Sequence, residues 1–389
     1  MMEISETLLA QQQVIRLQAL LEASRQLHST IKLEEVLHIA LEIVVRELEL
    51  TGAFFSTWPL SYGTVPPAFQ NLVASNATMW EVDFSCGPLM RLPLRDKTGT
   101  QFTELVLLIP PRRTLDFDEL DFLESLIVQA AVAIENAQFH KRALQWQRVE
   151  SDLEAARRVQ LSLIPQRMPS IPGYHLAAQS VTCYEVGGDY LDIVSLSSGK
   201  IVIVVADVAG KGLASALVGT SFRSALRAMV HSGLNLCEIA TRMNLLHFGE
   251  GVEAQRRYVT ALLMELDPAA HTLEVVNAGH NPAFLIAGDG TVRRLSASGI
   301  PIGMLPSSSY VTEEISLDFG ARLLVYTDGM TEVFCGSEEF GEDRLLEAFL
   351  HCDELTADLA LQSLWRTLET FSDGLEQSDD MTALTLFRG

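Results

Sequence analysis

Apolar and polar residues follow two different periods along this chain. Both periods occur between residues 14 and 139. Residues 33–50 carry apolar side chains at helical spacing, whereas residues 52–58 and 104–110 are typical of short strands. A longer helical pattern begins at residue 117. We expect Asp118 to be its N-cap, because its carboxylate can accept hydrogen bonds from first-turn amides. This order predicts a small α/β domain over residues 14–139.

The helical pattern continues beyond residue 139 as a seam of apolar positions three and four residues apart. Its first part is Leu123, Ile127, Ala130, Ile134, Ala137 and Leu144, and its second is Trp146, Val149, Leu153, Ala156, Gln160 and Leu163. The register changes between the two parts. The spacing predicts a helical linker over residues 140–165 that forms a dimeric coiled coil. The alternative is an ordinary amphipathic helix packed on its own domain.

Three prolines, Pro165, Pro169 and Pro172, are expected to end this helix, and strand patterns dominate beyond them. We expect strands over residues 175–181, 190–196, 200–208, 258–266, 272–278, 283–288, 322–329 and 381–387. Helices are expected over residues 213–231, 237–248, 344–349 and 357–371. Many strands with a few long helices between them predict an α+β domain over residues 166–389, a β-sandwich flanked by helices.

The composition indicates a globular protein and argues against some classes of binding partner. The 389 residues, of which 48% are hydrophobic, are enough for two or three domains with their own cores. The 50 acidic and 28 basic residues give a formal charge of −22, which repels phosphate backbones and argues against nucleic-acid binding. No apolar run reaches the roughly 20 residues that span a bilayer, and residues 1–13 do not resemble a signal peptide. We therefore expect a cytoplasmic protein without membrane insertion.

The cysteines are odd in number and scattered. They are Cys86, Cys183, Cys237, Cys335 and Cys352. No C-x-x-C pair occurs, so we expect reduced thiols in the core rather than disulfides or a zinc site. None begins the C-x₅-R loop that a cysteine-dependent phosphatase needs.

Acidic residues stand at the ends of several predicted strands. They are Asp189, Asp192, Asp207, Asp328, Asp379 and Asp380. Strand ends of packed sheets can meet at one mouth, where several carboxylates remain ionised only around cations. Carboxylate and carbonyl ligands suit Mg²⁺ or Mn²⁺ better than Zn²⁺. The alternative is that each aspartate is a solvated turn residue, since Asp before Gly is common in turns.

Seven blocks between residues 156 and 388 resemble, in order and spacing, the bacterial metal-dependent Ser/Thr phosphatases of the PPM family, particularly its RsbU and SpoIIE branch. The blocks are "VGGDYLD", "ADVAGKGLASAL", "YVTALLMELDP", "VNAGHNPAFLI", "LLVYTDGMTE", "EEFGEDRL" and "SDDMTALTL". The resemblance implies a PPM-type sandwich that hydrolyses phosphoserine or phosphothreonine with two divalent cations, Mn²⁺ or Mg²⁺, and a water that they activate. Residues 14–139 resemble a GAF sensor domain.

The resemblance also implies roles for individual residues. The implied catalytic set is Asp189, Asp207, Asp328 and Asp379, and the implied metal ligands are these four with Val208 and Asp380. Asp207 would bridge both metals. Val208 would contribute only its backbone carbonyl, and Asp380 ranks behind Asp379.

Two further features of these sequence blocks have more than one interpretation. Lys211 in "AGKG" could contact a phosphate, or it could be a solvated loop lysine. Its surroundings do not form a P-loop, because Gly212 stands where a P-loop has Ser or Thr. His280 and Asn281 in "NAGHNP" are expected to shape their loop rather than to bind metal.

The resemblance implies a regulated phosphatase acting on a phosphorylated STAS-type anti-anti-sigma protein in a partner-switching stress or developmental pathway. The alternative is a catalytically inactive, phosphatase-like scaffold that binds partners, although the presence of all four aspartates disfavours it. We expect an unidentified small-molecule or protein signal at the GAF-like domain of a homodimer. The linker helix would transmit this signal to the helix over residues 213–231, which follows Asp207.

Overall fold

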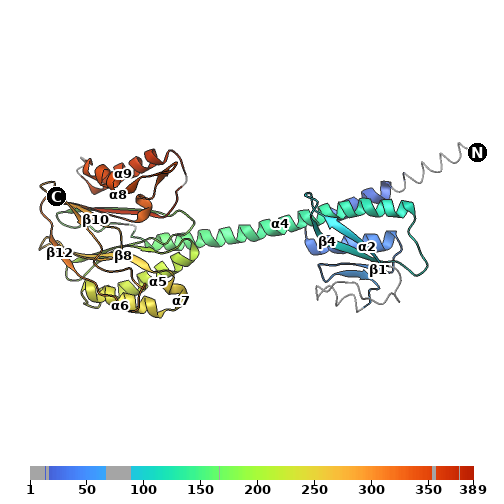
Figure 1. Ribbon diagram of the computed structural model, residues 1–389, viewed down its shortest axis with the longest axis horizontal. Helices are drawn as coiled ribbons and strands as arrows, with labels where there is room; N and C mark the ends of the chain where they lie inside the picture. The colour runs from blue at the N-terminus through green and yellow to red at the C-terminus, as the bar shows by residue number, and fades with distance from the viewer. Residues whose placement is uncertain (1–13, 15–16, 67–88, 166, 353–355, 376) are drawn as a thin grey trace, which may run out of the picture. The chain divides into compact units, whose positions relative to one another are not determined.

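The computed structural model describes residues 14, 17–66, 89–165, 167–352, 356–375 and 377–389 (Figure 1). The chain divides into two compact units, Met1–Val149 and Glu150–Gly389. Among the described residues, no helix is both long enough and apolar enough to cross a bilayer.

The first unit contains an antiparallel four-stranded sheet with helices on one face. Its strands lie in the order β2 (Ser61–Gly63), β1 (Gly52–Phe55), β4 (Gln101–Leu108) and β3 (Leu89–Arg95). Helix α2 (Leu33–Glu47) and the first part of helix α4 (Phe117–Leu163) share one apolar core with this sheet. Figure 1 shows these elements together in the first unit. A mixed α/β domain is therefore present, whereas its likeness to a GAF domain stays a prediction.

Helix α4 is capped by Asp116, and the prediction of Asp118 was wrong. The Asp116 carboxylate accepts a hydrogen bond from the amide of Glu119 at 2.8 Å, and the Glu119 carboxylate accepts one from the amide of Asp116 at 2.9 Å. This reciprocal pair is a capping box, and it satisfies two amides at once. Asp118 lies in the first turn instead, where a negative charge is favourable beside the free amides.

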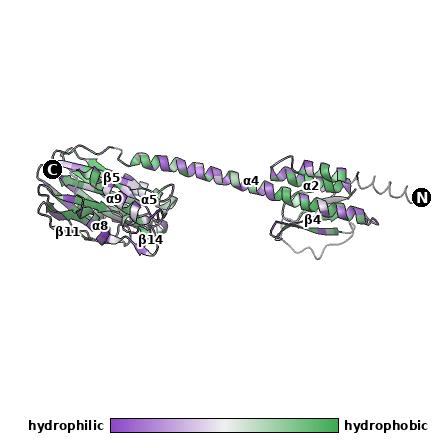
Figure 2. Cartoon of the chain, turned by 90° about the horizontal axis from the view of Figure 1, so that it is seen from above, coloured by the Kyte–Doolittle hydropathy of each residue, from purple (hydrophilic) through white to green (hydrophobic). Residues whose placement is uncertain are grey.

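The residues of the apolar seam of α4 differ in burial along the helix. Ala130, Ile134 and Ala137 are buried in the core of the first unit, which matches the alternative of a helix packed on its own domain. Leu144 and Trp146 are exposed in the single chain. Figure 2 shows many hydrophilic residues along α4. Pairing of the exposed part with a second chain stays a prediction.

The second unit is a sandwich of two antiparallel five-stranded sheets. One sheet has the order β11 (Val292–Leu295), β10 (Ala283–Ile286), β13 (Arg322–Tyr326), β16 (Met381–Arg388) and β5 (Tyr174–Val181). The other has the order β12 (Glu313–Ser316), β9 (Thr272–Ala278), β8 (Val259–Asp267), β7 (Ile201–Val208) and β6 (Tyr190–Ser195). Apolar side chains of both sheets, including Ile203, Leu262 and Leu384, form the core between them.

Helices cover both outer faces of this sandwich (Figure 1). Helices α5 (Leu213–Val230) and α6 (Leu236–Gly249) pack on the sheet that contains β7, and α8 (Gly341–Leu350) and α9 (Ala357–Ser372) pack on the other. The predicted sandwich flanked by helices is therefore confirmed. The sequence pattern missed the short elements α7 (Val252–Gln255), β11, β12, β14 (Phe334–Cys335) and β15 (Glu338–Glu339).

The described cysteines, Cys183, Cys237, Cys335 and Cys352, are free thiols. Only Cys352 among them is buried, whereas Cys335 is exposed in the short strand β14. The expectation of core thiols was therefore wrong for Cys335. Cys86 lies outside the described residues.

Candidate active site

Four predicted aspartates, two from each sheet of the sandwich, lie at strand ends where their charges interact. Asp189 directly precedes β6 and Asp207 lies near the end of β7, while Asp328 follows β13 and Asp379 precedes β16. Burial first, and then the charge of Asp207, raises the pKa of Asp189 well above its usual range. Burial and then the charge of Asp379 raise the pKa of Asp328. Strand ends of both sheets therefore meet at one edge of the sandwich.

Asp207 is the residue on which these charges act together. Burial, followed by the charges of Asp328, Asp379 and Asp380, raises its pKa to about 7. Strand β7 is otherwise buried, yet its next-to-last residue is a half-buried carboxylate that other carboxylates repel. A cation near this group would favour the ionised form of all of them.

A buried threonine holds the Asp189 side chain in place. The Thr327 hydroxyl donates to Asp189 Oδ2 at 2.8 Å and accepts from the amide of Thr382 at 2.9 Å. Both threonines are fully buried. Their role was not predicted from the sequence, although Thr327 precedes Asp328 and Thr382 closely follows Asp380. Each of these two acidic motifs contains a threonine, and this recurrence was the sequence signal that could have pointed to the two residues.

Asp380 fixes the loop that leads to Asp189. Its Oδ1 accepts from the amide of Cys183 at 2.7 Å, and its Oδ2 accepts from the amide of Gly188 at 2.6 Å. A side chain on Gly187 would not fit, because its Cβ would lie 2.4 Å from Asp380 Oδ2. Both carboxylate oxygens of Asp380 are thus engaged with the backbone of this loop.

Asp379 forms an ion pair with Lys211. The Lys211 ammonium lies 2.8 Å from Asp379 Oδ2 and donates to the carbonyl of Ser378 at 2.7 Å. Lys211 is therefore neither an isolated solvated lysine nor, in this arrangement, free for a phosphate. Because the pair is partly exposed, its contribution to stability is small, about 0–1 kcal/mol.

The backbone carbonyl of Val208 also borders the group. A Cβ at Gly188 would lie 2.8 Å from the Val208 carbonyl oxygen and 3.4 Å from Asp207 Oδ1. The loop before Asp189 and the end of β7 can therefore approach closely only because residue 188 is glycine.

The comparisons with known proteins concern the same unit. A family model described as "Stage II sporulation protein E (SpoIIE)" matches residues 197–388, a range that begins after Asp189. The solved SiaA-PP2C domain of Pseudomonas aeruginosa matches with a TM-score of 0.56 and 21% sequence identity, over 64% of this chain and 99% of that chain. The second unit is a SpoIIE-family domain with the PP2C fold.

Two curated relatives extend the similarity. Protein IcfG of Synechocystis sp. is 27% identical over 270 residues, which are 61% of this chain and 41% of IcfG. Phosphoserine phosphatase RsbU of Bacillus subtilis is 26% identical over 278 residues, which are 70% of this chain and 80% of RsbU. The chain thus spans less than half the length of IcfG.

Asp192 lies apart from the carboxylate group of this SpoIIE-family domain. It is fully buried inside β6, where Arg227 donates to its two oxygens at 2.6 and 2.7 Å and the Tyr190 hydroxyl donates at 2.6 Å. Burial opposes ionisation, but the bonds from Arg227 and Tyr190 lower the pKa of Asp192 below its usual value. Asp192 therefore ties β6 to α5 and is not a residue of the site.

His280 braces the loop between β9 and β10 of the SpoIIE-family domain. Its Nδ1 lies 2.8 Å from Thr260 Oγ1, and its amide donates to Asn277 Oδ1 at 2.8 Å. Burial lowers its pKa to about 4, so the imidazole is neutral at pH 7. The Asn277 side chain also donates to the carbonyl of Asn281 at 3.3 Å. His280 and Asn281 thus belong to a structured turn, as predicted.

Within the described ranges, no three His, Cys, Asp or Glu side chains already form a group that could hold a metal ion. The described carboxylates Asp189, Asp207, Asp328 and Asp379 interact through their charges. The arrangement combines several partly buried carboxylates, one nearby ammonium and one backbone carbonyl at the end of a sandwich.

Proposed function

We propose that this protein is a metal-dependent protein serine/threonine phosphatase. The observation that carries the proposal is the coupled group of carboxylates at the strand ends of a SpoIIE-family domain with the PP2C fold. The similarity to RsbU, which is named a phosphoserine phosphatase, supports it. We assign the catalytic set to Asp189, Asp207, Asp328 and Asp379, with Val208 and Asp380 as further candidate ligands.

The donor chemistry of the group fits divalent cations such as Mn²⁺ or Mg²⁺. Carboxylate and carbonyl oxygens are the ligands that these hard cations prefer. When bound, two such ions supply a water of lowered pKa and neutralise charge on the phosphoryl oxygens. Burial and then the neighbouring carboxylate charges raise the pKa of Asp207 to about 7, and a bound cation would offset both by favouring the ionised form. Thr327 would orient Asp189, and Asp380 would hold the loop before it.

For the substrate, we propose a phosphorylated STAS-type anti-anti-sigma protein in a partner-switching stress or developmental pathway. Support comes from the similarity to RsbU and from the sequence blocks that resemble the RsbU and SpoIIE branch. The acidic surface expected from a net charge of −22 suits a protein partner better than a nucleic acid.

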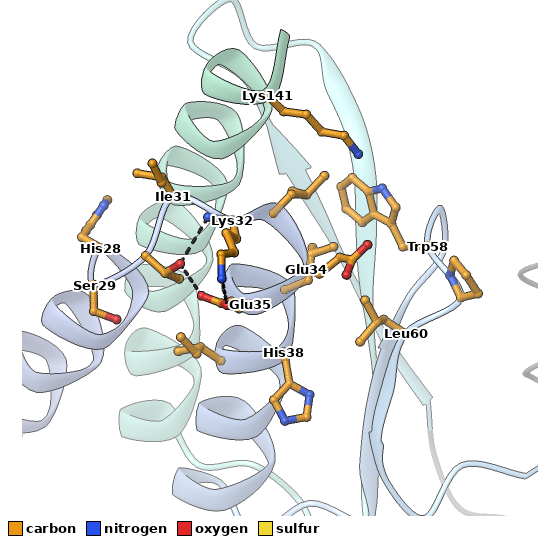
Figure 3. A pocket seen from close by; sticks show the side chains of 15 residues that line it. His28, Ser29, Ile31, Lys32, Glu34, Glu35, His38, Trp58, Leu60 and Lys141 are labelled. Atoms are coloured by element: carbon orange, nitrogen blue, oxygen red, sulfur yellow. Dashed lines mark hydrogen bonds and ion pairs between the residues drawn. The ribbon is translucent and has the colours of Figure 1, made fainter. Parts of the chain in front are cut away.

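We further propose that residues 14–139 form a GAF-like sensor domain, residues 140–165 a dimerising linker and residues 166–389 the phosphatase domain. A hollow of about 1070 Å³ in the first unit is a candidate place for a small-molecule signal. Figure 3 shows Glu34, Trp58 and Lys141 among its lining side chains. Lys141 belongs to α4, which continues into the second unit. A monomeric protein whose turnover did not change on deletion of residues 1–140 would contradict this regulation.

The test is hydrolysis of a phosphoserine peptide by the 389-residue chain with Mn²⁺. We expect turnover that stops with EDTA and falls at least about a hundredfold in Asp328→Asn, a loss in the range seen when a group that stabilises the transition state is removed. Asp318→Asn is the matched control, because Asp318 is exposed in a loop outside the group. Binding of the phosphopeptide without any Mn²⁺-dependent hydrolysis would favour the inactive scaffold instead.

A further inference from the structure

The second unit has a hollow of about 440 Å³ beside helix α9, which residues of β5, β14 and β16 also line. Its surface is mainly apolar, and the apolar side chains include Val333, Trp365, Leu368 and Met381. A few polar residues, among them Gln377 and Ser378, complete the lining. Hollows of this size with apolar walls and a few polar groups are typical of ligand sites. The proposed chemistry gives this hollow no role.

The hollow lies beside the carboxylate group. Gly329 and Ser378 line it, and they are the chain neighbours of Asp328 and Asp379. Consecutive Cα atoms are about 3.8 Å apart, so the hollow begins about one residue away from two of the proposed ligands. A phosphoserine bound at the carboxylate group would therefore bring the neighbouring residues of its own chain close to the hollow.

Hydrogen bonds hold the wall between the hollow and the carboxylates. The Ser378 hydroxyl donates to the carbonyl of Glu332 at 2.8 Å, and the Ser378 carbonyl accepts from the Lys211 ammonium at 2.7 Å. Gln377 Nε2 donates to the carbonyl of Val181 at 3.0 Å. The polar groups of this wall are thus engaged within the protein. The hollow is therefore preformed, as ligand sites usually are.

Two exposed apolar side chains border the hollow. Phe334 in β14 is 41% exposed, and Leu375 after α9 is 53% exposed. Exposed apolar groups gathered at a concave surface mark a place for a partner. Trp365 also lines the hollow, and its buried indole N–H has no hydrogen-bond partner in the part of the chain that the structure describes. An apolar side chain together with its peptide carbonyl would supply both kinds of missing contact.

We propose that this hollow is a specificity subsite for the protein substrate. It takes a large apolar side chain that lies within about three positions of the phosphoserine along the substrate chain. Phe334, Trp365 and Leu375 are the residues that select this side chain. The inference rests on the proposed function, because it takes the carboxylate group as the phosphoserine site. It adds the chemistry of a flanking residue, which the proposed function leaves open.

The test uses phosphoserine peptides with either leucine or alanine at each of the three positions before and after the phosphoserine. The ratio of kcat/KM for each leucine peptide to that of its alanine counterpart is measured with Mn²⁺ for the 389-residue chain. The same ratios are measured for Phe334→Ser and Leu375→Ser, whose exposed positions should leave folding intact. Phe319→Ser is the matched control, because Phe319 is 74% exposed and precedes β13, whereas Gly329 of the hollow lies beyond the other end of that strand.

We expect leucine at one of these positions to raise the kcat/KM of the wild type about tenfold over alanine, equivalent to about 1.4 kcal/mol. The gain should come mainly from a lower KM, because a side chain far from the reacting atoms binds equally in the ground state and the transition state. In Phe334→Ser and Leu375→Ser the ratio should fall to about threefold or less, whereas Phe319→Ser should keep it.

Two results would overturn the inference while the proposed function stands. One is hydrolysis by the wild type without a preference for leucine at any position. The other is a full leucine preference in both Phe334→Ser and Leu375→Ser. If the wild type hydrolyses none of the peptides, the inference and the proposed function are both overturned.

Discussion

Replacing Asp207 with asparagine should stabilise the metal-free protein at neutral pH. The carboxylate of Asp207 is half-buried beside Asp328, Asp379 and Asp380, and burial together with these charges raises its pKa to about 7. In the unfolded chain an aspartate ionises near pH 4. Folding without a cation therefore works against ionisation of this group, and the neutral amide of asparagine removes that penalty.

The size of the effect follows from the two pKa values. Because the pKa of Asp207 is higher in the folded protein than in the unfolded chain, the free energy of unfolding falls as the pH rises from about 4 to about 7. Above pH 7 it changes little. The penalty is about 4 kcal/mol at pH 7.5 and about 1 kcal/mol at pH 4.5, as an upper bound for one group. If the substitution recovers half of this penalty, the second unit of Asp207→Asn should melt roughly 4–8 °C above that of the wild type at pH 7.5.

The assay is thermal unfolding of both proteins in EDTA at pH 7.5 and pH 4.5, followed by circular dichroism. We expect the advantage of Asp207→Asn to be clear at pH 7.5 and to shrink at pH 4.5. Added Mn²⁺ should reverse the order at pH 7.5 by stabilising the wild type more. A metal-free Asp207→Asn protein that melts below the wild type at pH 7.5 would refute the reasoning, because the carboxylates would then not repel one another.

Three further predictions concern residues around the site. Thr327→Val should weaken Mn²⁺ binding measured by calorimetry, because Asp189 loses its donor, while Thr327→Ser should retain it; equal losses in both would argue against the hydroxyl. Arg227→Met should destabilise the fold by about 2 kcal/mol in denaturant titration, because the buried Asp192 loses both hydrogen bonds from Arg227 and keeps only Arg223, 3.9 Å away, as an ion-pair partner. Adding Asp192→Asn should restore part of this, and no recovery would contradict the pairing. Lys211→Met should strengthen Mn²⁺ binding a few-fold, because the ammonium competes for its carboxylate partner; weaker binding would point to another role.

The strands that carry the proposed ligands could be predicted because they are buried on both faces. Residues 201–206 of β7 are all buried, between the sandwich core and the helices α5 and α6, so the sequence there is a continuous apolar run. The short strands β14 and β15 are exposed and have no such run. Burial on both faces therefore explains why the aspartates at the strand ends stood out.

The residues that the sequence did not reveal act through contacts between distant segments. Thr327 bonds to Asp189 across 138 positions of the chain, and no local pattern encodes that pairing. Gln160 was assigned to an apolar seam, although its side-chain amide forms hydrogen bonds with the backbone of Gly187. The cap of α4 was misplaced for a local reason, since Asp116 and Asp118 are both acidic and each has a carboxylate residue three positions later, Glu119 and Asp121. The reciprocal hydrogen bonds of Asp116 and Glu119 identify the capping box.

The most direct test of the central claim is a calorimetric titration of Mn²⁺ into the metal-free 389-residue chain at pH 7.5, beside Asp207→Asn. The account predicts two bound ions per wild-type chain and release of protons on binding, because Asp207 is partly protonated near this pH. Asp207→Asn should lose at least one of the two ions. Binding by Asp207→Asn with the stoichiometry and affinity of the wild type, or no binding by either protein, would contradict the assignment of this carboxylate group as a metal centre.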